Sequence, residues 1–376
     1  MKILQILPGF TLGGPTFSTS ALTRHMQALG HQVQFHTAEG DFSGYEDIDF
    51  HTYHIHRFPY NSQLAFSIEL YKHLKKECKD AQIVQTNSLW QFPNYIHEYC
   101  RRKTNAKSVI VPRGTLSEYA LSLSSKKKKL VMALGQRTAL KNADMFIATC
   151  KKEYEDIRKF GLKQPVAVLP NGLYLPEPKN TNKKNTVIFL GRIHKVKGVD
   201  ILLKAWRTIE SNEKFKDWNL IIAGPTASDY AKEIQQQASD LKSVSFTGEV
   251  KGDVKNELLS RASIYVLPTH TENFGISVGE ALACGTPVIT TTGAPWSGLV
   301  DNNCGLWIEL SVKNLTQALE DMMSRSIDEL TRMGENGRQW MNRDFAWEEI
   351  ARKTIKSYEW LLDPDYVKKP EWIFVD

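Results

Sequence analysis

The chain contains 376 residues, of which 41% are hydrophobic and 24% are charged. This length is too great for one ordinary hydrophobic core and predicts two domains, while the composition excludes a disordered or fibrous protein. The net charge of +6 is unevenly distributed, since residues 1–175 hold 23 Lys and Arg against 14 Asp and Glu, and the rest of the chain holds 25 against 28. The amino-terminal half is therefore basic and suits anionic lipids, phosphates or nucleic acid.

No stretch reaches the roughly 20 apolar residues of a transmembrane helix, and Pro8 and Gly9 end the first apolar run too early for a signal peptide. The five cysteines are odd in number, widely spaced and form no CxxC or Cys/His cluster. This pattern predicts reduced thiols in a cytoplasmic protein and argues against structural zinc.

The amino-terminal half alternates predicted strands and helices. Gly13 and Gly14 lie in the turn after the first strand, where they suit either a tight turn without ligand or a phosphate contact, although the GxGxxG pattern is absent. Asn87 and Trp90 follow a strand at the end where ligands of open α/β sheets bind. We expect strands at 2–7, 33–37, 81–86, 109–111, 146–149 and 166–169, and helices at 15–29, 64–79 and 130–141.

A loop rich in histidine and aromatic residues is expected at 50–60. Its His51, His54 and His56 are spaced three and two apart without acidic partners. Such spacing is more typical of a surface or core strand than of a metal site, so no metal ion is predicted here.

Four consecutive lysines, Lys126, Lys127, Lys128 and Lys129, open the predicted helix at 130–141. A charge run on a helix is usually a solvated face. The alternative is docking on an anionic membrane, to which each lysine near the surface contributes about 1 kcal/mol.

After a polar linker at 176–185, the carboxyl-terminal half starts a second alternation. Arg192 and Lys197 flank the turn after its first strand, where two cations either converge on a diphosphate or form a basic turn without ligand. We expect strands at 186–190, 220–223, 244–247, 264–268 and from 287, and helices at 199–209, 315–323, 327–340 and 345–362.

The stretch ENFGISVGEALACGTPVI, residues 272–289, predicts a loop, a short helix and a strand entry. The helix start leaves the N–H groups of Phe274, Gly275 and Ile276 without helical partners, which suits a phosphate or a sugar. Glu272 lies at the mouth of this helix and Glu280 lies inside it. A carboxylate in such a place accepts hydrogen bonds from the vicinal hydroxyls of a ribose or hexose.

Together, the run Gly191-Arg192…Lys197-Gly198 and the Glu-x7-Glu spacing of Glu272 and Glu280 closely resemble retaining glycosyltransferases of the GT-B fold, family 4, or glycosyltransferase group 1. The resemblance covers nearly the whole chain and implies an α/β protein with two Rossmann-like parallel-sheet domains facing across a cleft. It implies an acceptor-binding domain at 1–175, a donor-binding domain at 176–345, and a C-terminal helix and tail at 346–376 that cross back to the first domain.

The resemblance also implies roles for individual residues. Arg192, Lys197 and Glu272 are the expected catalytic residues, with the two cations on the diphosphate. The rest of the implied donor site comprises Asn273, Phe274, Gly275 and Ile276 beside the hexose, Glu280 on the ribose, Val250 against the base, and Gly13, Gly14 and Gly191 near the donor.

On the acceptor side, the run Pro112-Arg113-Gly114-Thr115-Leu116 resembles the Pro-Arg-Gly-Met-Leu loop of a family 4 subgroup. Many relatives carry histidine where Arg113 stands. Because arginine stays protonated, Arg113 suits a clamp on acceptor or phosphate better than a base, and Asn87 and Trp90 complete the expected acceptor side. Gly224-Pro225 departs from the Gly-Asp-Gly of many relatives near the nucleotide.

The implied activity is retaining transfer of a hexosyl residue from a nucleotide diphosphate sugar to a hydroxyl acceptor. UDP-sugar is favoured over GDP-sugar, and the acceptor is a glycan or lipid-linked saccharide, as in cell-surface polysaccharide or lipopolysaccharide synthesis at the cytoplasmic face of a membrane. No cofactor and no metal are expected for catalysis, because Asp47-Ile48-Asp49 and Asp363-Pro364-Asp365 do not lie where a metal-dependent GT-A enzyme places its Asp-x-Asp.

Two other functions remain open from the sequence. A nucleotide-sugar 2-epimerase shares the two-domain fold and differs in converting the donor alone. A non-catalytic protein that binds glycans or nucleic acid would use the basic half. Binding of nucleic acid does not need the acidic residues Glu272 and Glu280 beside the donor cations, so no nucleic-acid partner is predicted.

Overall fold

The structure is a computed structural model that describes residues 1–9, 14–38, 55–59, 64–177 and 183–375. The chain divides into two compact units, with unit 1 formed by Met1–Gly172 and Trp347–Asp376 and unit 2 by Leu173–Ala346. The boundaries expected from the sequence, 175 and 345, lie within three residues of these two divisions.

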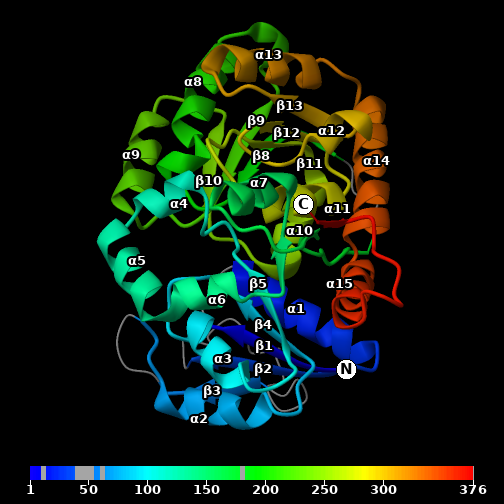
Figure 1. Cartoon of the computed structure of the whole chain (residues 1–376). Coiled ribbons are helices and arrows are strands. Elements are labelled where there is room, and N and C mark those ends of the chain that lie inside the picture. The colour runs from blue at the N-terminus through cyan, green and yellow to red at the C-terminus, as the bar shows by residue number, and fades with distance from the viewer. Residues whose placement is uncertain (10–13, 39–54, 60–63, 178–182, 376) are drawn as a thin grey trace. The chain divides into compact units, whose positions relative to one another are not determined.

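Unit 1 contains an eight-stranded sheet in the order β14-β7-β6-β5-β4-β1-β2-β3. Figure 1 labels five of these neighbours, from β5 to β3. Every neighbouring pair is parallel except β14 and β7, which are antiparallel. The strands are β1 (Lys2–Leu7), β2 (Gln32–Ala38), β3 (Ile55–Phe58), β4 (Ile83–Asn87), β5 (Lys107–Val111), β6 (Met145–Ala148), β7 (Val166–Val168) and β14 (Ile373–Phe374).

Helices cover both faces of this sheet, because a parallel sheet buries both faces. Ile3 belongs to a core shared with α1 and α15, whereas the next residue, Leu4, belongs to the core beneath α2. This follows from the alternation of side chains along a strand. The helices are α1 (Gly14–Ala28), α2 (Ile68–Glu77), α3 (Pro93–Arg101), α4 (Glu118–Ser122), α5 (Ser125–Val131), α6 (Arg137–Lys141), α7 (Lys151–Lys159) and α15 (Trp347–Leu362).

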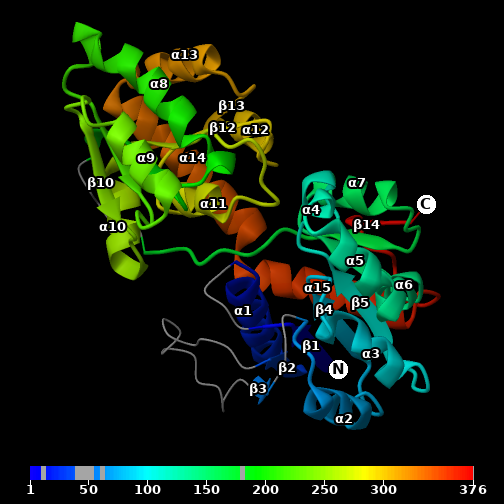
Figure 2. The same ribbon diagram turned by 90° about the vertical axis from the view of Figure 1, so that its left-hand side faces the viewer.

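The carboxyl-terminal segment belongs to unit 1, where α15 lies beside α1 (Figures 1 and 2). The ring of Trp347 lies against the backbone of Gly172, since a Cβ added to that glycine would lie 2.3 Å from the indole. Trp372 then donates from Nε1 to Ser357 Oγ (2.9 Å) and accepts the N–H of Val168 (2.9 Å). The apolar tail is thus packed against the unit rather than left in solvent.

Parts of unit 1 differ from the sequence-based expectation. The helix expected at 130–141 is interrupted by a π-helical turn at Met132–Gln136, where Gly135 packs against Tyr95 so closely that a Cβ would lie 2.8 Å from its ring. The loop expected at 50–60 contains strand β3, and helices α3, α4 and α7 were not predicted. His51 and His54 lie outside the described residues.

Unit 2 contains a six-stranded, all-parallel sheet in the order β10-β9-β8-β11-β12-β13. Its strands are β8 (Lys184–Leu190), β9 (Asn219–Ala223), β10 (Val244–Gly248), β11 (Ala262–Leu267), β12 (Val288–Thr291) and β13 (Gly305–Ile308). Its helices are α8 (Val199–Glu210), α9 (Asp229–Gln237), α10 (Gly252–Arg261), α11 (Ile276–Ala283), α12 (Gly298–Asp301), α13 (Val312–Met323) and α14 (Ile327–Phe345), with α8 against α13 and α11 against α14. Of these, α9, α10 and α12 were not predicted.

Each sheet has a point where the chain reverses the direction in which it adds strands. In unit 1 this point lies between β1 and β4, and in unit 2 between β8 and β11. Ligands of open α/β sheets bind at the carboxyl ends of the strands beside such a point. The topology therefore marks the loops after β8 and β11 as the first place to look for a site in unit 2.

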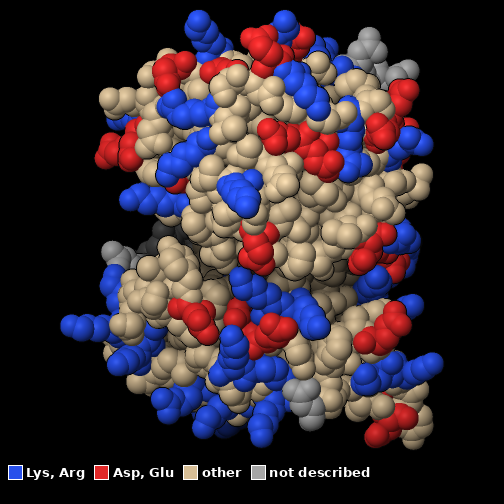
Figure 3. Space-filling model, turned by 90° about the horizontal axis from the view of Figure 1, so that it is seen from above, with Lys and Arg blue, Asp and Glu red and all other residues tan. Residues whose placement is uncertain are grey.

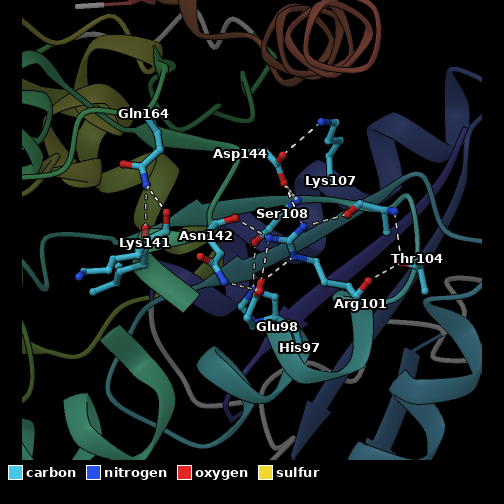
Figure 4. A network of polar contacts seen from close by, with 12 residues as sticks. His97, Glu98, Arg101, Thr104, Lys107, Ser108, Lys141, Asn142, Asp144 and Gln164 are labelled. Carbon is cyan, nitrogen blue, oxygen red and sulfur yellow. Dashed lines mark hydrogen bonds and ion pairs between the residues drawn. The ribbon is translucent and has the colours of Figure 1, made fainter. Parts of the chain in front are cut away.

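A polar network lies at the opposite, amino-terminal ends of β5 and β6 in unit 1 (Figure 4). Arg101 donates to Glu98 Oε2 (2.8 Å) and Asp144 Oδ2 (3.1 Å), and Lys107 pairs with Asp144 Oδ1 (3.2 Å). The side chains of Arg101 and Glu98 are 11% and 5% exposed, so this ion pair is nearly buried. Its position indicates a structural role, tying the end of α3 to two strands.

Among the described residues, no helix is long and apolar enough to cross a membrane. The five cysteines are all free thiols. Lys and Arg side chains and Asp and Glu side chains are interspersed over the face drawn in Figure 3.

Candidate active site in unit 2

The loops that follow β8 and β11 meet at the reversal point of the second sheet. Gly198 has a φ of +66°, and a Cβ added there would lie 2.0 Å from the Pro268 carbonyl oxygen. The Val196 carbonyl accepts the N–H of His270 (2.8 Å) and the hydroxyl of Thr269 (2.9 Å). A glycine is required here because the two backbones approach too closely for any side chain.

Lys197 and Glu272 form an ion pair between these two loops. Their side chains are 16% and 13% exposed, so the pair is largely shielded from solvent. The N–H of Glu272 donates to the Gly293 carbonyl (2.9 Å), and this bond also fixes Glu272 to the loop after β12. The sequence placed these charges 75 positions apart, and the fold brings them into contact.

Arg192 lies on the same loop as Lys197 and is exposed. Its loop is anchored by the N–H of Gly191, which donates to the Ala223 carbonyl (2.9 Å). Gly224 lies against this turn, because a Cβ there would lie 2.0 Å from the Gly191 carbonyl oxygen. Arg192 makes no ion pair within the described part of the chain, so its guanidinium is available to an anion. Val250, after β10, is half-buried against the core of unit 2.

Helix α11 starts at Gly275, which has a φ of +77° and caps the helix without a side chain. The N–H groups of Phe274, Gly275 and Ile276 make no hydrogen bond to any described residue, and they remain available to a ligand. Trp296 fixes this corner by donating from Nε1 to the Phe274 carbonyl (2.6 Å) while its ring packs on the ring of Phe274. Asn273 lies between Glu272 and this helix start.

Glu280 lies one turn into α11 and pairs with Lys255 of α10 (Nζ to Oε1, 2.7 Å). Glu272 and Glu280 therefore each have a lysine of their own and do not form a carboxylate pair. Tyr265 links the two sides of the site, because its hydroxyl contacts the Leu190 carbonyl (3.2 Å) and Ser277 Oγ (2.7 Å). Burial raises the pKa of Tyr265, so this hydroxyl keeps its proton.

Unit 1 holds the residues expected on the acceptor side. Arg113, with a φ of +57°, donates to Asn87 Oδ1 (2.8 Å), Asn171 Oδ1 (3.0 Å) and Thr19 Oγ1 (3.2 Å). Burial lowers the pKa of Arg113 to about 10, so it is still charged at neutral pH. All three partners are neutral, and a cavity of about 30 Å³ lies beside the guanidinium.

Trp90 follows Asn87 by three residues in the segment after β4 and is held by different contacts. Its Nε1 donates to the Thr115 carbonyl (3.2 Å), and Lys128 Nζ lies 5.6 Å from the centre of its ring. Gly14 is the first residue of α1, and Gly13 lies outside the described residues.

Comparisons with known proteins agree with this geometry. The family model described as "Glycosyl transferases group 1" matches residues 175–340, and that of "Glycosyltransferase Family 4" matches residues 12–175. The chain belongs to the group 1 glycosyltransferases.

An uncharacterized glycosyltransferase of Methanocaldococcus jannaschii is 25% identical over 360 residues, which cover 94% of this chain and 96% of that protein. Among solved structures, the sucrose-phosphate synthase of Thermosynechococcus elongatus has a TM-score of 0.75 at 20% identity and covers 97% of this chain and 100% of that chain. Anabaena HepE in complex with UDP and glucose has a TM-score of 0.74 at 17% identity, with 96% and 99% covered. The predicted GT-B fold of two parallel-sheet α/β domains is confirmed.

Several residues that lie at this candidate site were missed by sequence reasoning. Lys255, Thr269 and Trp296 contact predicted site residues, and Tyr265 contacts Ser277 of α11, yet none of the four belongs to the motifs that drew attention. Trp296 directly follows the run Gly293-Ala294-Pro295, and a large aromatic residue after such a glycine- and proline-containing run was the available signal.

Proposed function

We propose that this glycosyltransferase moves a hexosyl residue from a nucleotide diphosphate sugar to a hydroxyl acceptor, with retention at the anomeric carbon. The observation that carries the proposal is the convergence of Arg192, Lys197 and Glu272 with the start of α11 at the reversal point of the second sheet. Two cations and a row of open N–H groups suit a diphosphate, and a carboxylate beside them suits sugar hydroxyls.

The donor is assigned to unit 2. Arg192 and Lys197 bind the diphosphate, while Glu272 and the N–H groups of Asn273, Phe274 and Gly275 bind the hexose. Glu280 binds the ribose hydroxyls, with Lys255 holding its carboxylate in place, and Val250 packs against the base. UDP is the favoured nucleotide, and the structure of HepE with UDP and glucose supports a nucleotide-sugar donor for this fold.

The proposed chemistry is a front-face displacement. The bond between C1 and the diphosphate oxygen breaks, and its electron pair stays on that oxygen, where Arg192 and Lys197 stabilise the charge. The acceptor hydroxyl attacks C1 from the same face and gives its proton to the departing oxygen. The pairing of Glu272 with Lys197 supports a positioning role for this carboxylate rather than that of a nucleophile. Trapping a covalent glycosyl-enzyme would overturn this mechanism.

The decisive experiment is a screen of nucleotide sugars for slow hydrolysis without acceptor, combined with calorimetry on UDP and GDP. Binding of one nucleotide together with release of its hexose supports the proposal. Conversion of the donor to an epimer without acceptor would instead indicate a 2-epimerase. Binding of neither nucleotide would indicate a non-catalytic protein. Activity is expected to persist in excess EDTA, and its loss with rescue by manganese would contradict the metal-independent mechanism.

For the acceptor, we propose a glycan or lipid-linked saccharide, positioned by Asn87, Trp90 and Arg113 of unit 1. A charged arginine among neutral amides supports an acceptor that carries a phosphate or carboxylate. Replacing Arg113 by lysine keeps the charge and removes the planar fork, so acceptor KM should rise while UDP affinity stays unchanged.

We also propose contact between α5 and an anionic membrane. Leu130 and Leu134 are 57% and 48% exposed close to the lysine run, which supports an interfacial face. Lys128 turns away from that face, because its Nζ donates to the Leu123 carbonyl (2.8 Å) and lies over Trp90. Co-sedimentation with phosphatidylglycerol vesicles should therefore fall when Lys126 and Lys129 become serine, and it should be absent with neutral vesicles.

A further inference from the structure

Three histidines of unit 1 come together at the edge of the eight-stranded sheet. His36 lies in β2, His56 in β3 and His73 in α2. His36 and His56 are register partners on neighbouring parallel strands, so their side chains project to the same face. His36 also pairs in register with Ile6, whose side chain belongs to the core beneath α2. Helix α2 therefore covers the face that carries both strand histidines.

The ring nitrogens of this cluster converge on one point. The Nε2 atoms of His36 and His73 are 3.1 Å apart, and ligating atoms from all three side chains lie within 4.8 Å of one another. Two nitrogens bound at 2.0–2.1 Å to a tetrahedral ion are about 3.3–3.4 Å apart. The Nε2 atoms of His36 and His73 thus need to move apart by only a few tenths of an ångström to bind the same ion.

We propose that His36, His56 and His73 bind a divalent transition-metal ion, with zinc preferred. Within the described part of the chain, they form the one group of three or more His, Cys, Asp or Glu side chains whose ligating atoms converge in this way. Three imidazoles are a ligand set suited to zinc, copper or nickel, whereas magnesium and calcium prefer oxygen ligands. His56 and His73 are half-buried, so water has access to a fourth position.

The surrounding charges are compatible with a cation. His36 is buried and His56 and His73 are half-buried, and the neutral form of imidazole is the one that ligates metals. Lys2, one of the lysines whose charge acts on these rings, pairs with Glu77 (Nζ to Oε2, 2.9 Å). The alternative is a set of hydrogen-bonded imidazoles without metal.

The proposed ion has a structural role. It would join β3, the edge strand of the sheet, to β2 and α2. None of the three histidines is among the residues proposed to bind donor or acceptor, so the ion is assigned no part in the proposed transfer. Chelation is therefore expected to lower the melting temperature without changing affinity for UDP.

The test uses the full chain, stripped with a chelator and dialysed. Calorimetry with zinc chloride should show one ion bound per chain, and zinc should raise the melting temperature, because a ligand of the folded state stabilises it. Cobalt(II) should give visible absorption bands without the intense near-ultraviolet band of cobalt–thiolate bonds. A thiolate band would assign the ion to cysteine and overturn the proposal.

His73→Ala removes a half-buried ligand and leaves the strands intact. It should weaken zinc affinity about tenfold or more and remove most of the thermal shift. His56→Asn should do the same, and His31→Gln, a half-buried histidine of unit 1 outside the cluster, should bind zinc as the wild type does. No zinc binding by the wild type, or an unchanged response in His73→Ala, would show hydrogen-bonded imidazoles only.

Discussion

Replacing Glu272 by glutamine separates nucleotide binding from sugar binding in unit 2. Glutamine keeps the size of the side chain and one oxygen acceptor but removes the charge that pairs with Lys197. A diphosphate competes with Glu272 for the same ammonium group, so the free protein must give up this ion pair when the nucleotide binds. Removing the carboxylate charge therefore removes a competitor.

The expected magnitudes follow from the two interactions of this carboxylate, its ion pair with Lys197 and its proposed hydrogen bonds with the hexose. An ion pair near the surface contributes up to about 1 kcal/mol, so Glu272→Gln should bind UDP with unchanged affinity or up to about fivefold more tightly. A hydrogen bond from a sugar hydroxyl to a charged acceptor contributes about 1.5–3 kcal/mol. Its weakening should lower kcat/KM for transfer by roughly 10- to 150-fold.

Calorimetry with UDP and initial rates with the hexosyl donor measure the two effects separately. The matched control is Glu257→Gln, which removes an exposed carboxylate paired with Arg261 on α10 (2.9 Å) and should change neither quantity. A loss of UDP affinity greater than tenfold in Glu272→Gln would refute the reasoning. It would mean that the carboxylate holds Lys197 in its binding position rather than competing for it.

Four further predictions concern both units. Glu280→Ala should weaken UDP binding by about 1–3 kcal/mol in calorimetry if Glu280 holds the ribose. Gly198→Ala should lower both unfolding free energy and UDP affinity, because the added Cβ collides with the neighbouring loop; its left-handed φ alone costs about 1–2 kcal/mol. Arg101→Met should cost about 3–5 kcal/mol in urea unfolding, since it leaves Glu98 buried and unpaired, with UDP affinity unchanged. Burial and the charge of Arg101 lower the pKa of His97 from 6.5 to about 3. Between these two pH values the unfolded chain binds a proton that the folded chain does not, so the free energy of unfolding of the wild type decreases as the pH falls through this window. His97→Gln should reduce that decrease by up to about 1.4 kcal/mol per pH unit.

The parallel-sheet architecture was predictable because its rules are local. Short apolar strands, glycine-rich turns and amphipathic helices alternate along the chain, and in a parallel sheet all the carboxyl ends lie at one edge. This rule alone brings Arg192, after β8, near Glu272, after β11. The direct contact of Lys197 with Glu272 goes further, because it depends on the close approach of Gly198 to its neighbour.

The missed contacts depend on packing between distant elements. Lys255 and Glu280 lie 25 positions apart on two helices, and α10 was not recognised, so no local pattern linked them. The same holds for the histidines. The short spacing within 50–60 drew attention to His56, but the register of β2 and β3, which places His36 beside it, could not be read from the sequence.

The two lysine–glutamate pairs of unit 2 suggest an order for the assembly of its site. In the ligand-free state, Lys197 neutralises Glu272 and Lys255 neutralises Glu280. A diphosphate that reaches Lys197 frees the Glu272 carboxylate, and that carboxylate then needs new hydrogen-bond donors, which the hydroxyls of the attached hexose provide. Glu280 has no such competitor, because a ribose carries no charge and Lys255 can stay in place. Under the proposed function, binding of the diphosphate therefore frees the Glu272 carboxylate to accept hydrogen bonds from the hexose attached to it. A free hexose instead meets a carboxylate that is still paired with Lys197.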